Sequence, residues 1–392
     1  MKYSTVCALL ALSLGACGGG DSSTPDASHL DATGPEAPVD ASCPRTTPTG
    51  DHTRWVVISH PFAANGDDGI TWEVLSLAPD GTLTRLNQAF TMGTKALGQI
   101  HFTPDGQLGI VAQDDGTMGE FFLGADGKPT VLEGGARGQG LWYANDIVIS
   151  ADGQYAYVID QDTADNDGGI YQLHIGCDSF ARDQGLVYGV GSPGGLTLLD
   201  GGKALVATPA GVDLVDTTTM PWTKTTTANP FPDTMTIVGG TALTADGSTY
   251  LVGDDNQFET SEGMNRLGVV TVGASSLTPV TELDIDDPIT ELAAPSGHTV
   301  LSVSGYGNAV FIVDDSTGSW GVRGEPAYVG AAPQLPSGGV ITADGLALVA
   351  ELSGVRPFQI TGGEVTDKGL FLIGDGSGDD LADIVGAIGV SP

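Results

Sequence analysis

Residues Ala151–Asp160 read ADGQYAYVID, an Asp-Gly turn followed by an apolar segment typical of a buried β-strand. The turn recurs along the chain, at Asp105-Gly106, Asp152-Gly153, Asp200-Gly201, Asp246-Gly247, Ser296-Gly297 and Asp344-Gly345. These turns are spaced by 47, 48, 46, 50 and 48 residues. Such a regular spacing indicates an internal repeat. We expect each Asp-Gly to close a β-hairpin, because both residues tolerate positive φ.

Each repeat has room for about four strands, because a short apolar segment also precedes each turn, as in Gln99–Thr103 and Asp146–Ser150. His52–His60 (HTRWVVISH) starts a seventh repeat that lacks its first strand. Seven repeats of four antiparallel strands predict an all-β fold, a seven-bladed β-propeller, in which circular closure protects the sheet edges. The leftover C-terminal segment Asp383–Val390 (DIVGAIGV) is expected to complete blade 1.

The composition supports short strands and excludes one class of partner. The chain has 392 residues, including 59 Gly, and its 14 Lys and Arg against 49 Asp and Glu give a formal net charge of −35. A protein this acidic has no basic face for nucleic acid, so we expect no nucleic-acid partner. The sequence contains none of the Gly-x-Ser-x-Gly, His-Glu-x-x-His, Cys-x-x-Cys or Gly-Lys-Ser/Thr motifs, so familiar hydrolase and nucleotide-binding signatures are missing.

The N-terminus predicts export and a lipid anchor. Residues 1–16 combine Lys2 with a short apolar stretch and are expected to be a signal peptide. Leu14-Gly15-Ala16-Cys17 resembles the bacterial lipobox, which implies that Cys17 receives acyl chains such as palmitate and holds the protein to the membrane. The alternative is an ordinary signal peptide with a coincidental cysteine. Gly18 after the cysteine favours a lipid-anchored place in the cell envelope, at the outer membrane, on either its periplasmic or its outer surface.

Three parts of the chain are therefore expected. They are the signal peptide at 1–16, the lipidated cysteine with a disordered tether rich in Gly, Ser, Thr, Pro and Asp at 17–50, and the propeller at 51–392. Cys7 leaves with the signal, so Cys43 and Cys177 remain for the mature domain. An oxidising compartment favours a disulfide between them, with two separate thiols as the alternative.

Two short segments resemble a known group of propellers. Phe311–Gly318 (FIVDDSTG) and Leu214–Thr219 (LVDTTT) are similar to the repeats of bacterial YVTN and lactonase-like seven-bladed propellers, over roughly residues 51–392. The resemblance implies a possible lactone hydrolase with its site at the mouth of the channel. His101 lies in an inner strand and Arg137 between blades 2 and 3, so both are candidates for base and oxyanion clamp, with a core-edge histidine and a surface arginine as the alternative. Asn145, Asp146 and Glu291 stand at blade entries, where the resemblance places metal ligands.

A calcium site is predicted near the C-terminus. Asp375–Ala387 (DGSGDDLADIVGA) resembles the calcium loop of FG-GAP propeller repeats. The resemblance implies Ca²⁺ as cofactor, with Asp375, Ser377, Asp379, Asp383 and the carbonyl of Leu381 as ligands; hard Ca²⁺ prefers such oxygen ligands. Asp380 stands where that pattern has Gly, and the alternative is a bare acidic turn.

One face of the propeller is expected to be acidic. Acids gather where the second strand of a blade ends, at Asp67, Asp68, Asp114, Asp115, Asp160, Asp162, Asp165, Asp167, Asp254, Asp255 and Glu351. Such a rim attracts cations or basic ligands, although a merely solvated surface is the alternative. The sequence favours a non-catalytic binding or scaffolding domain with a protein or small-molecule ligand at this face, and a lactonase-like hydrolase is the rival hypothesis.

Overall fold

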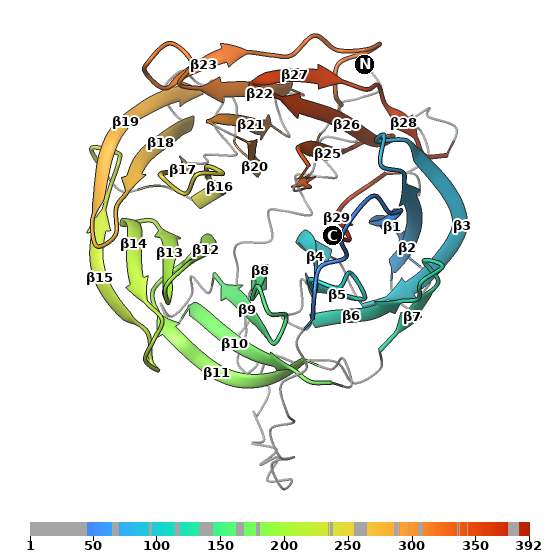
Figure 1. Cartoon of the computed structure of the whole chain (residues 1–392), viewed down its shortest axis with the longest axis horizontal. Coiled ribbons are helices and arrows are strands. Elements are labelled where there is room, and N and C mark those ends of the chain that lie inside the picture. The colour runs from blue at the N-terminus through green and yellow to red at the C-terminus, as the bar shows by residue number, and fades with distance from the viewer. Residues whose placement is uncertain are drawn as a thin grey trace, which may run out of the picture. The chain divides into compact units, whose positions relative to one another are not determined.

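Seven antiparallel sheets stand around a central axis, as the repeat spacing predicts (Figure 1). The computed structural model of the chain describes residues 45–64, 70–93, 96–113, 118–132, 144–161, 168–177, 181–233, 235, 238–254, 265–285, 289, 291–296, 298–304, 309–334, 336, 338–342, 344–374 and 384–392. All the regular elements in these segments are strands, and none of the segments holds a helix long and apolar enough to cross a membrane. The fold is an all-β, seven-bladed β-propeller.

The strands of each blade follow one another from the axis outward. Blade 1 is β29 (Ile388–Val390), β1 (Arg54–Ala64), β2 (Ile70–Leu77) and β3 (Leu83–Met92). Blade 2 is β4 (Ala96–Phe102), β5 (Leu108–Gln113), β6 (Met118–Leu123) and β7 (Pro129–Val131), and blade 3 is β8 (Ala144–Ile149), β9 (Tyr155–Asp160), β10 (Gly169–Ile175) and β11 (Ala181–Gly189). Blade 4 is β12 (Gly195–Leu199), β13 (Lys203–Thr208), β14 (Gly211–Asp216) and β15 (Thr223–Ala228).

The remaining three blades repeat this order. Blade 5 is β16 (Val238–Leu243), β17 (Thr249–Asp254), β18 (Asn265–Val272) and β19 (Leu277–Ile285), and blade 6 is β20 (Glu291–Ser296), β21 (Thr299–Ser304), β22 (Ala309–Asp314) and β23 (Gly321–Gly324). Blade 7 is β24 (Gly338–Ile341), β25 (Leu346–Glu351), β26 (Gly354–Thr361) and β27 (Glu364–Asp367), and β28 (Phe371–Leu372) also pairs with β26.

The C-terminal strand closes the ring in blade 1, which confirms the sequence prediction. Strand β29 lies antiparallel to β1, with Ile388 opposite Ile58. The strand is shorter than predicted, because the residues just before β29 do not continue its regular pairing with β1. Instead, the Ser59 hydroxyl accepts the Ala387 N–H at 2.8 Å and the Ser59 carbonyl accepts the Gly386 N–H at 2.9 Å. Asp383, the predicted first residue of the strand, lies outside the described residues.

The hydrophobic core lies between the blades, in seven clusters that each join two neighbours. Because side chains alternate across a strand, one strand serves two seams. In β5, Leu108 and Ile110 face the cluster shared with blade 3, and Val111 faces the one shared with blade 1. This explains why the second strands of the blades are mostly apolar on both faces.

The Asp-Gly turns close hairpins, as predicted. Only the glycines have positive φ, for example 71° at Gly106 and 70° at Gly247. The aspartate keeps negative φ because its carboxylate binds locally: Asp105 accepts the Thr103 hydroxyl at 2.6 Å, and that hydroxyl accepts the Leu108 N–H at 3.1 Å. A hydroxyl residue holds the same position two residues before the aspartate in four of the turns, at Thr103, Ser150, Thr244 and Thr342. A Ser/Thr-x-Asp-Gly pattern would have revealed this feature from the sequence.

Cations join neighbouring blades on the face that carries these turns. Arg45 is nearly buried there: its Nη1 donates to Asp105 at 3.0 Å in blade 2, and its backbone N–H donates to the Asp152 carbonyl at 3.2 Å in blade 3. Arg54 in blade 1 donates to Asp344 in blade 7 at 2.7 Å. Arg45, near the end of the predicted tether, is therefore bonded to the propeller, whereas residues 46–50 after it are exposed.

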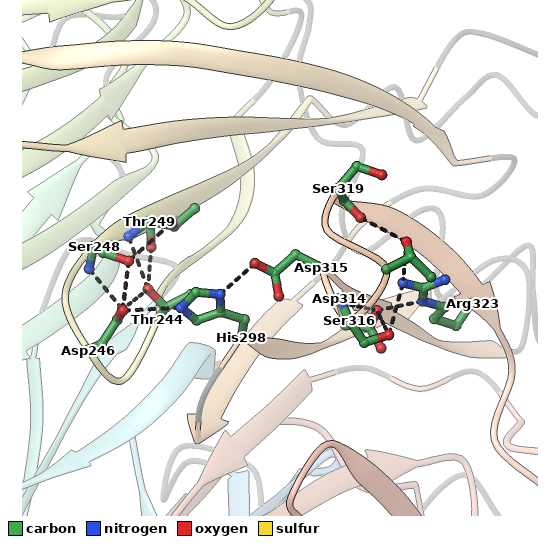
Figure 2. A network of polar contacts seen from close by, with 11 residues as sticks. Thr244, Asp246, Ser248, Thr249, His298, Asp314, Asp315, Ser316, Ser319 and Arg323 are labelled. Carbon is green, nitrogen blue, oxygen red and sulfur yellow. Dashed lines mark hydrogen bonds and ion pairs between the residues drawn. The ribbon is translucent and has the colours of Figure 1, made fainter.

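A histidine makes the equivalent link between blades 5 and 6 (Figure 2). Nδ1 of His298 lies 2.6 Å from Asp315, Nε2 lies 3.1 Å from Asp246 across the seam, and the ring stacks on Trp320. The bonds to Asp315 and Asp246 raise the pKa of His298 above its ordinary value of 6.5. The pKa of Asp246 is lowered, first by the backbone N–H of Ser248 and then by His298. The charged ring thus bridges two carboxylates.

We expect Ile388→Ala to destabilise the propeller by about 2–5 kcal/mol, because Ile388 is fully buried in the cluster between blades 1 and 7. Denaturant melts would measure the change. Val280→Ala, at an exposed position of the outer strand β19, is the control and should change stability by less than about 0.5 kcal/mol. Equal effects of the two substitutions would contradict the structural role of the closing strand.

The His298 bridge should make stability depend on pH. Because the folded pKa of His298 is raised, the bridge contributes fully below about pH 6.5 and is lost as pH rises through the folded pKa. We expect the free energy of unfolding of wild type to exceed that of His298→Gln by up to about 1 kcal/mol near pH 6, since the group is partly exposed, and the difference to close as pH rises through the folded pKa. Denaturant melts across this range would show it, with His174→Gln, whose ring packs edge-on against Tyr155, as control. A gap that does not vary with pH would refute the bridge.

Candidate functional site

The predicted acidic rim is only partly described, and its described members are not exposed. Asp160, Asp254 and Glu351 each have about 1% of their surface exposed. Asp254 lies directly opposite Arg266 on the next strand, and the guanidinium Nε donates to it at 3.1 Å. The expectation of a solvent-facing rim is therefore wrong for these three acids, because they turn into the blades. Asp67, Asp68, Asp114, Asp115, Asp162, Asp165, Asp167 and Asp255 lie outside the described residues.

Glu351 belongs to a buried network that holds blade 7 together. Arg356 donates from Nε to Glu351 at 2.6 Å and from Nη1 to Asp367 at 2.8 Å. Its Nη2 donates to the carbonyl of Ala331 at 2.9 Å, and Glu351 accepts the N–H of Gln334 at 2.8 Å. These bonds fasten the connection from blade 6 onto blade 7, so this charge cluster is structural.

One pair of predicted residues meets on the channel wall. His101 lies on β4 and Asp146 on β8, the innermost strands of blades 2 and 3 (Figure 1). His101 Nε2 is 2.7 Å from Asp146 Oδ1, and both side chains are partly exposed. An aspartate at Nε2 fixes the proton there and leaves Nδ1 as the proton acceptor of the neutral ring. From the sequence, His101 is expected as a base and Asp146 as a metal ligand, whereas the structure pairs them.

The other channel candidates cannot be placed. Arg137 lies outside the described residues. Asn145 and Glu291 fall on β8 and β20, but their side chains are not described. Among the described residues, no group of three or more His, Cys, Asp or Glu side chains is arranged to hold a metal ion.

A second polar site was not predicted and lies on blade 1. A hollow of about 300 Å³ is lined by His60, Ala63, Thr71, Glu73, Arg85, Asn87 and Ala89 from β1, β2 and β3. His60 and Glu73 are buried, with 4% and 3% of their surface exposed, whereas Arg85 is about half-exposed. Glu73 accepts N–H groups from Nε and Nη2 of Arg85, the second at 2.8 Å, and its Oε2 lies 3.5 Å from Nε2 of His60.

The electrostatics of this hollow keep Glu73 ionised. Burial raises the pKa of Glu73, but the bonds from His60 and Arg85 outweigh it, so the pKa is lowered overall. Nδ1 of His60 is buried and has no hydrogen-bond partner. The charged Glu73 inside the mostly apolar strand ITWEVLSL is the sequence feature that indicates this site. The sequence alone does not place His60 beside it, because that depends on the register of β1 on β2.

The backbone of β3 is distorted at the hollow. The register of β2 and β3 shifts between Val74 and Leu75, which face Gln88 and Arg85. Asn87 lies in this bulge and has φ of 56°, one of only two positive values among the described residues other than glycine. Bulges re-aim side chains, and backbone strain of this kind gathers at functional sites.

The remaining predicted site residues are three cysteines and the four residues of the calcium loop. Cys17, Cys43, Asp375, Ser377, Asp379 and Asp383 all lie outside the described residues. Cys177 is disulfide-bonded, and its pairing with Cys43 stays a prediction.

Comparison with known proteins shows the fold alone. No protein-family model matches the sequence, and a search of curated proteins finds no match. Among solved structures, a candidate 6-phosphogluconolactonase from Bacteroides fragilis is 12% identical, with a TM-score of 0.59, over 88% of this chain and 100% of that one. A protein from Lactobacillus plantarum is 9% identical, with a TM-score of 0.59, over 87% and 100%. A candidate 6-phosphogluconolactonase from Bacteroides uniformis is 18% identical, with a TM-score of 0.54, over 69% and 80%.

Proposed function

We propose that the chain is a cell-envelope lipoprotein whose propeller is a non-catalytic binding or scaffolding module. The signal-like residues 1–16 and the lipobox-like Leu14–Cys17 support export and lipid attachment at Cys17. Two acyl chains give stable anchoring without a membrane-spanning helix. With Gly18 after the cysteine, the outer membrane is the proposed destination.

The observation that carries a binding role is the state of the charges in the blade 1 hollow. A general base works best when its pKa lies near the working pH. Glu73 has a lowered pKa and both oxygens engaged by Arg85, so it is a poor proton acceptor. Groups that are already paired and held in place suit recognition of a ligand better than proton transfer.

The net charge supports a second kind of contact. A charge of −35 creates a negative potential that draws in cations and basic partners. We therefore keep a protein or small-molecule ligand at the acidic face as part of the proposal. Since Asp160, Asp254 and Glu351 are buried, that contact rests on the total charge and not on these three acids.

Calcium is the proposed cofactor of the C-terminal loop. Asp375, Asp379 and Asp383 bring three carboxylates into nine residues, which repel one another until a cation neutralises them. Together with Ser377 they supply the oxygen ligands that Ca²⁺ prefers. The loop leads into the segment that closes blade 1, so bound calcium would order the seam between blades 1 and 7.

A lactonase-like hydrolase is the second candidate, and His101 with Asp146 favours it. A histidine oriented by a carboxylate is the usual arrangement of a general base, and this one stands on the channel wall. Both candidate 6-phosphogluconolactonases share the propeller fold with this chain. An assay of lactone hydrolysis separates the two functions. Activity in wild type that is lost in His101→Ala favours the hydrolase, and no activity in wild type favours the binding module.

Cys17→Ala should move the protein from the membrane fraction to the soluble fraction, because the lipid is then missing. Fractionation followed by immunoblotting would measure the shift, together with a change in gel mobility. Cys7→Ala is the matched control, since Cys7 lies in the part that leaves with the signal. Membrane retention and mobility that stay the same in Cys17→Ala would sink the anchoring proposal.

Millimolar Ca²⁺ should raise the melting temperature of the mature chain above its value in EDTA. A ligand that binds only the folded state adds about 2.7 kcal/mol at a hundredfold excess over Kd. Asp379→Ala should abolish the shift, and Asp126→Ala, at an exposed turn of blade 2, should keep it. Mg²⁺ serves as the ion control. The calcium proposal fails if Ca²⁺ leaves the midpoint where it was, or if Asp379→Ala keeps the whole shift.

A further inference from the structure

His60, which lines the hollow on blade 1, has a ring nitrogen without a hydrogen-bond partner. Nε2 of His60 faces the Glu73 carboxylate, which can only accept, so in the neutral ring the proton sits on Nε2. Nδ1 is then an acceptor, and it is buried without a partner. An unsatisfied buried acceptor costs about 1–3 kcal/mol. A donor from outside the protein, such as a hydroxyl, would satisfy it.

Charge balance excludes strongly ionic ligands. Glu73 and Arg85 cancel one another across their two-point contact. An anion in the hollow would meet the Glu73 carboxylate, and a cation would meet the Arg85 guanidinium. The charge of −35 on the whole chain further disfavours anions. A neutral polar ligand is left.

The lining also sets the ligand's size and its mix of donors and acceptors. Asn87 offers an amide that both donates and accepts, whereas the Thr71 hydroxyl already donates to the Ala63 carbonyl at 3.0 Å. Ala63 and Ala89 leave space between these polar groups. A volume of about 300 Å³ is at the lower end for ligand pockets, so the ligand is small.

We propose that the blade 1 hollow binds a neutral polyhydroxylated ligand of about the size of one sugar ring, with a hydroxyl donating to Nδ1 of His60 and others contacting Asn87. The inference rests on the proposed binding function and names its site and ligand class. Nδ1 is screened from solvent, so the contact needs a small rotation of the His60 ring. Neighbouring hydroxyls each donate and accept, which matches an amide, an imidazole and a paired guanidinium.

Titration of the mature full-length protein with glucose, galactose and N-acetylglucosamine tests the proposal, in a detergent without a sugar head group. Saturation-transfer NMR or calorimetry would detect binding, and acetate and ethylammonium are the ionic comparisons. We expect at least one sugar to bind saturably in the millimolar range and neither ion to compete. If no sugar binds, or if acetate or ethylammonium competes, the ligand class is wrong.

Asn87→Gly is the decisive variant, because glycine accepts a φ of 56° without strain and the substitution removes only the amide. We expect sugar binding to weaken by about tenfold, the equivalent of about 1.4 kcal/mol, while stability is kept or improved. Ser192→Gly is the matched control: Ser192 is the other described residue besides glycine with positive φ, at 51°, and it lies between blades 3 and 4. It should bind like wild type.

Ala89→Leu fills the hollow from its exposed side and should also abolish binding. Unchanged sugar binding in both Asn87→Gly and Ala89→Leu would overturn the proposed site. That result would leave the envelope-anchored binding function in place, since the ligand would then bind elsewhere on the propeller. Failure of the function itself is seen separately, in the Cys17→Ala fractionation and the lactone assay.

Discussion

Closure of the ring is the constraint on which the rest of this structure depends. Each blade is apolar on both faces and is covered only by its two neighbours, so the seven clusters form an unbroken circle. Without β29, blade 1 would lose its inner strand and the cluster with blade 7 would lose Ile388. Gly389 is needed in this strand, because a Cβ there would lie 2.3 Å from the Ile100 carbonyl oxygen of blade 2. The C-terminal strand therefore packs against both neighbours of blade 1, which are blade 7 and blade 2.

The few cations of this acidic protein pair with carboxylates both between blades, as Arg45 and Arg54 do, and within single blades. With 14 Lys and Arg against 49 acids, most carboxylates have no cationic partner available. Within the described part of the chain, the arginines that pair with carboxylates are Arg45, Arg54, Arg85, Arg266, Arg323 and Arg356. Pairing in buried positions stabilises little by itself, because desolvation offsets the attraction. It does fix strand ends and connections, which gives the propeller a rigid frame while its total charge stays strongly negative.

The sequence was sufficient for the repeat, the seven blades and the closing strand, because these follow from turn spacing and apolar segments. It was insufficient for pairs that form between distant segments. His101 and Asp146 are 45 residues apart and meet only because their strands lie side by side on the channel wall. Asp254 and Glu351 were expected in solvent, but their arginine partners follow in the next strand and draw them inside. The blade 1 hollow needed the register of β1, β2 and β3, which turn spacing does not determine.

The hollow and the closing seam lie on the same side of blade 1. His60 is two residues from Ile58 on β1, and Glu73 is two residues from Leu75 on β2, so each pair points to one face of the sheet. Ile58 and Leu75 belong to the cluster that blade 1 shares with blade 7. A ligand in the hollow therefore sits beside the seam on which the ring depends. Because anything bound only to the closed ring stabilises it by RT ln(1 + [L]/Kd), occupancy of the hollow and closure of the propeller are thermodynamically linked.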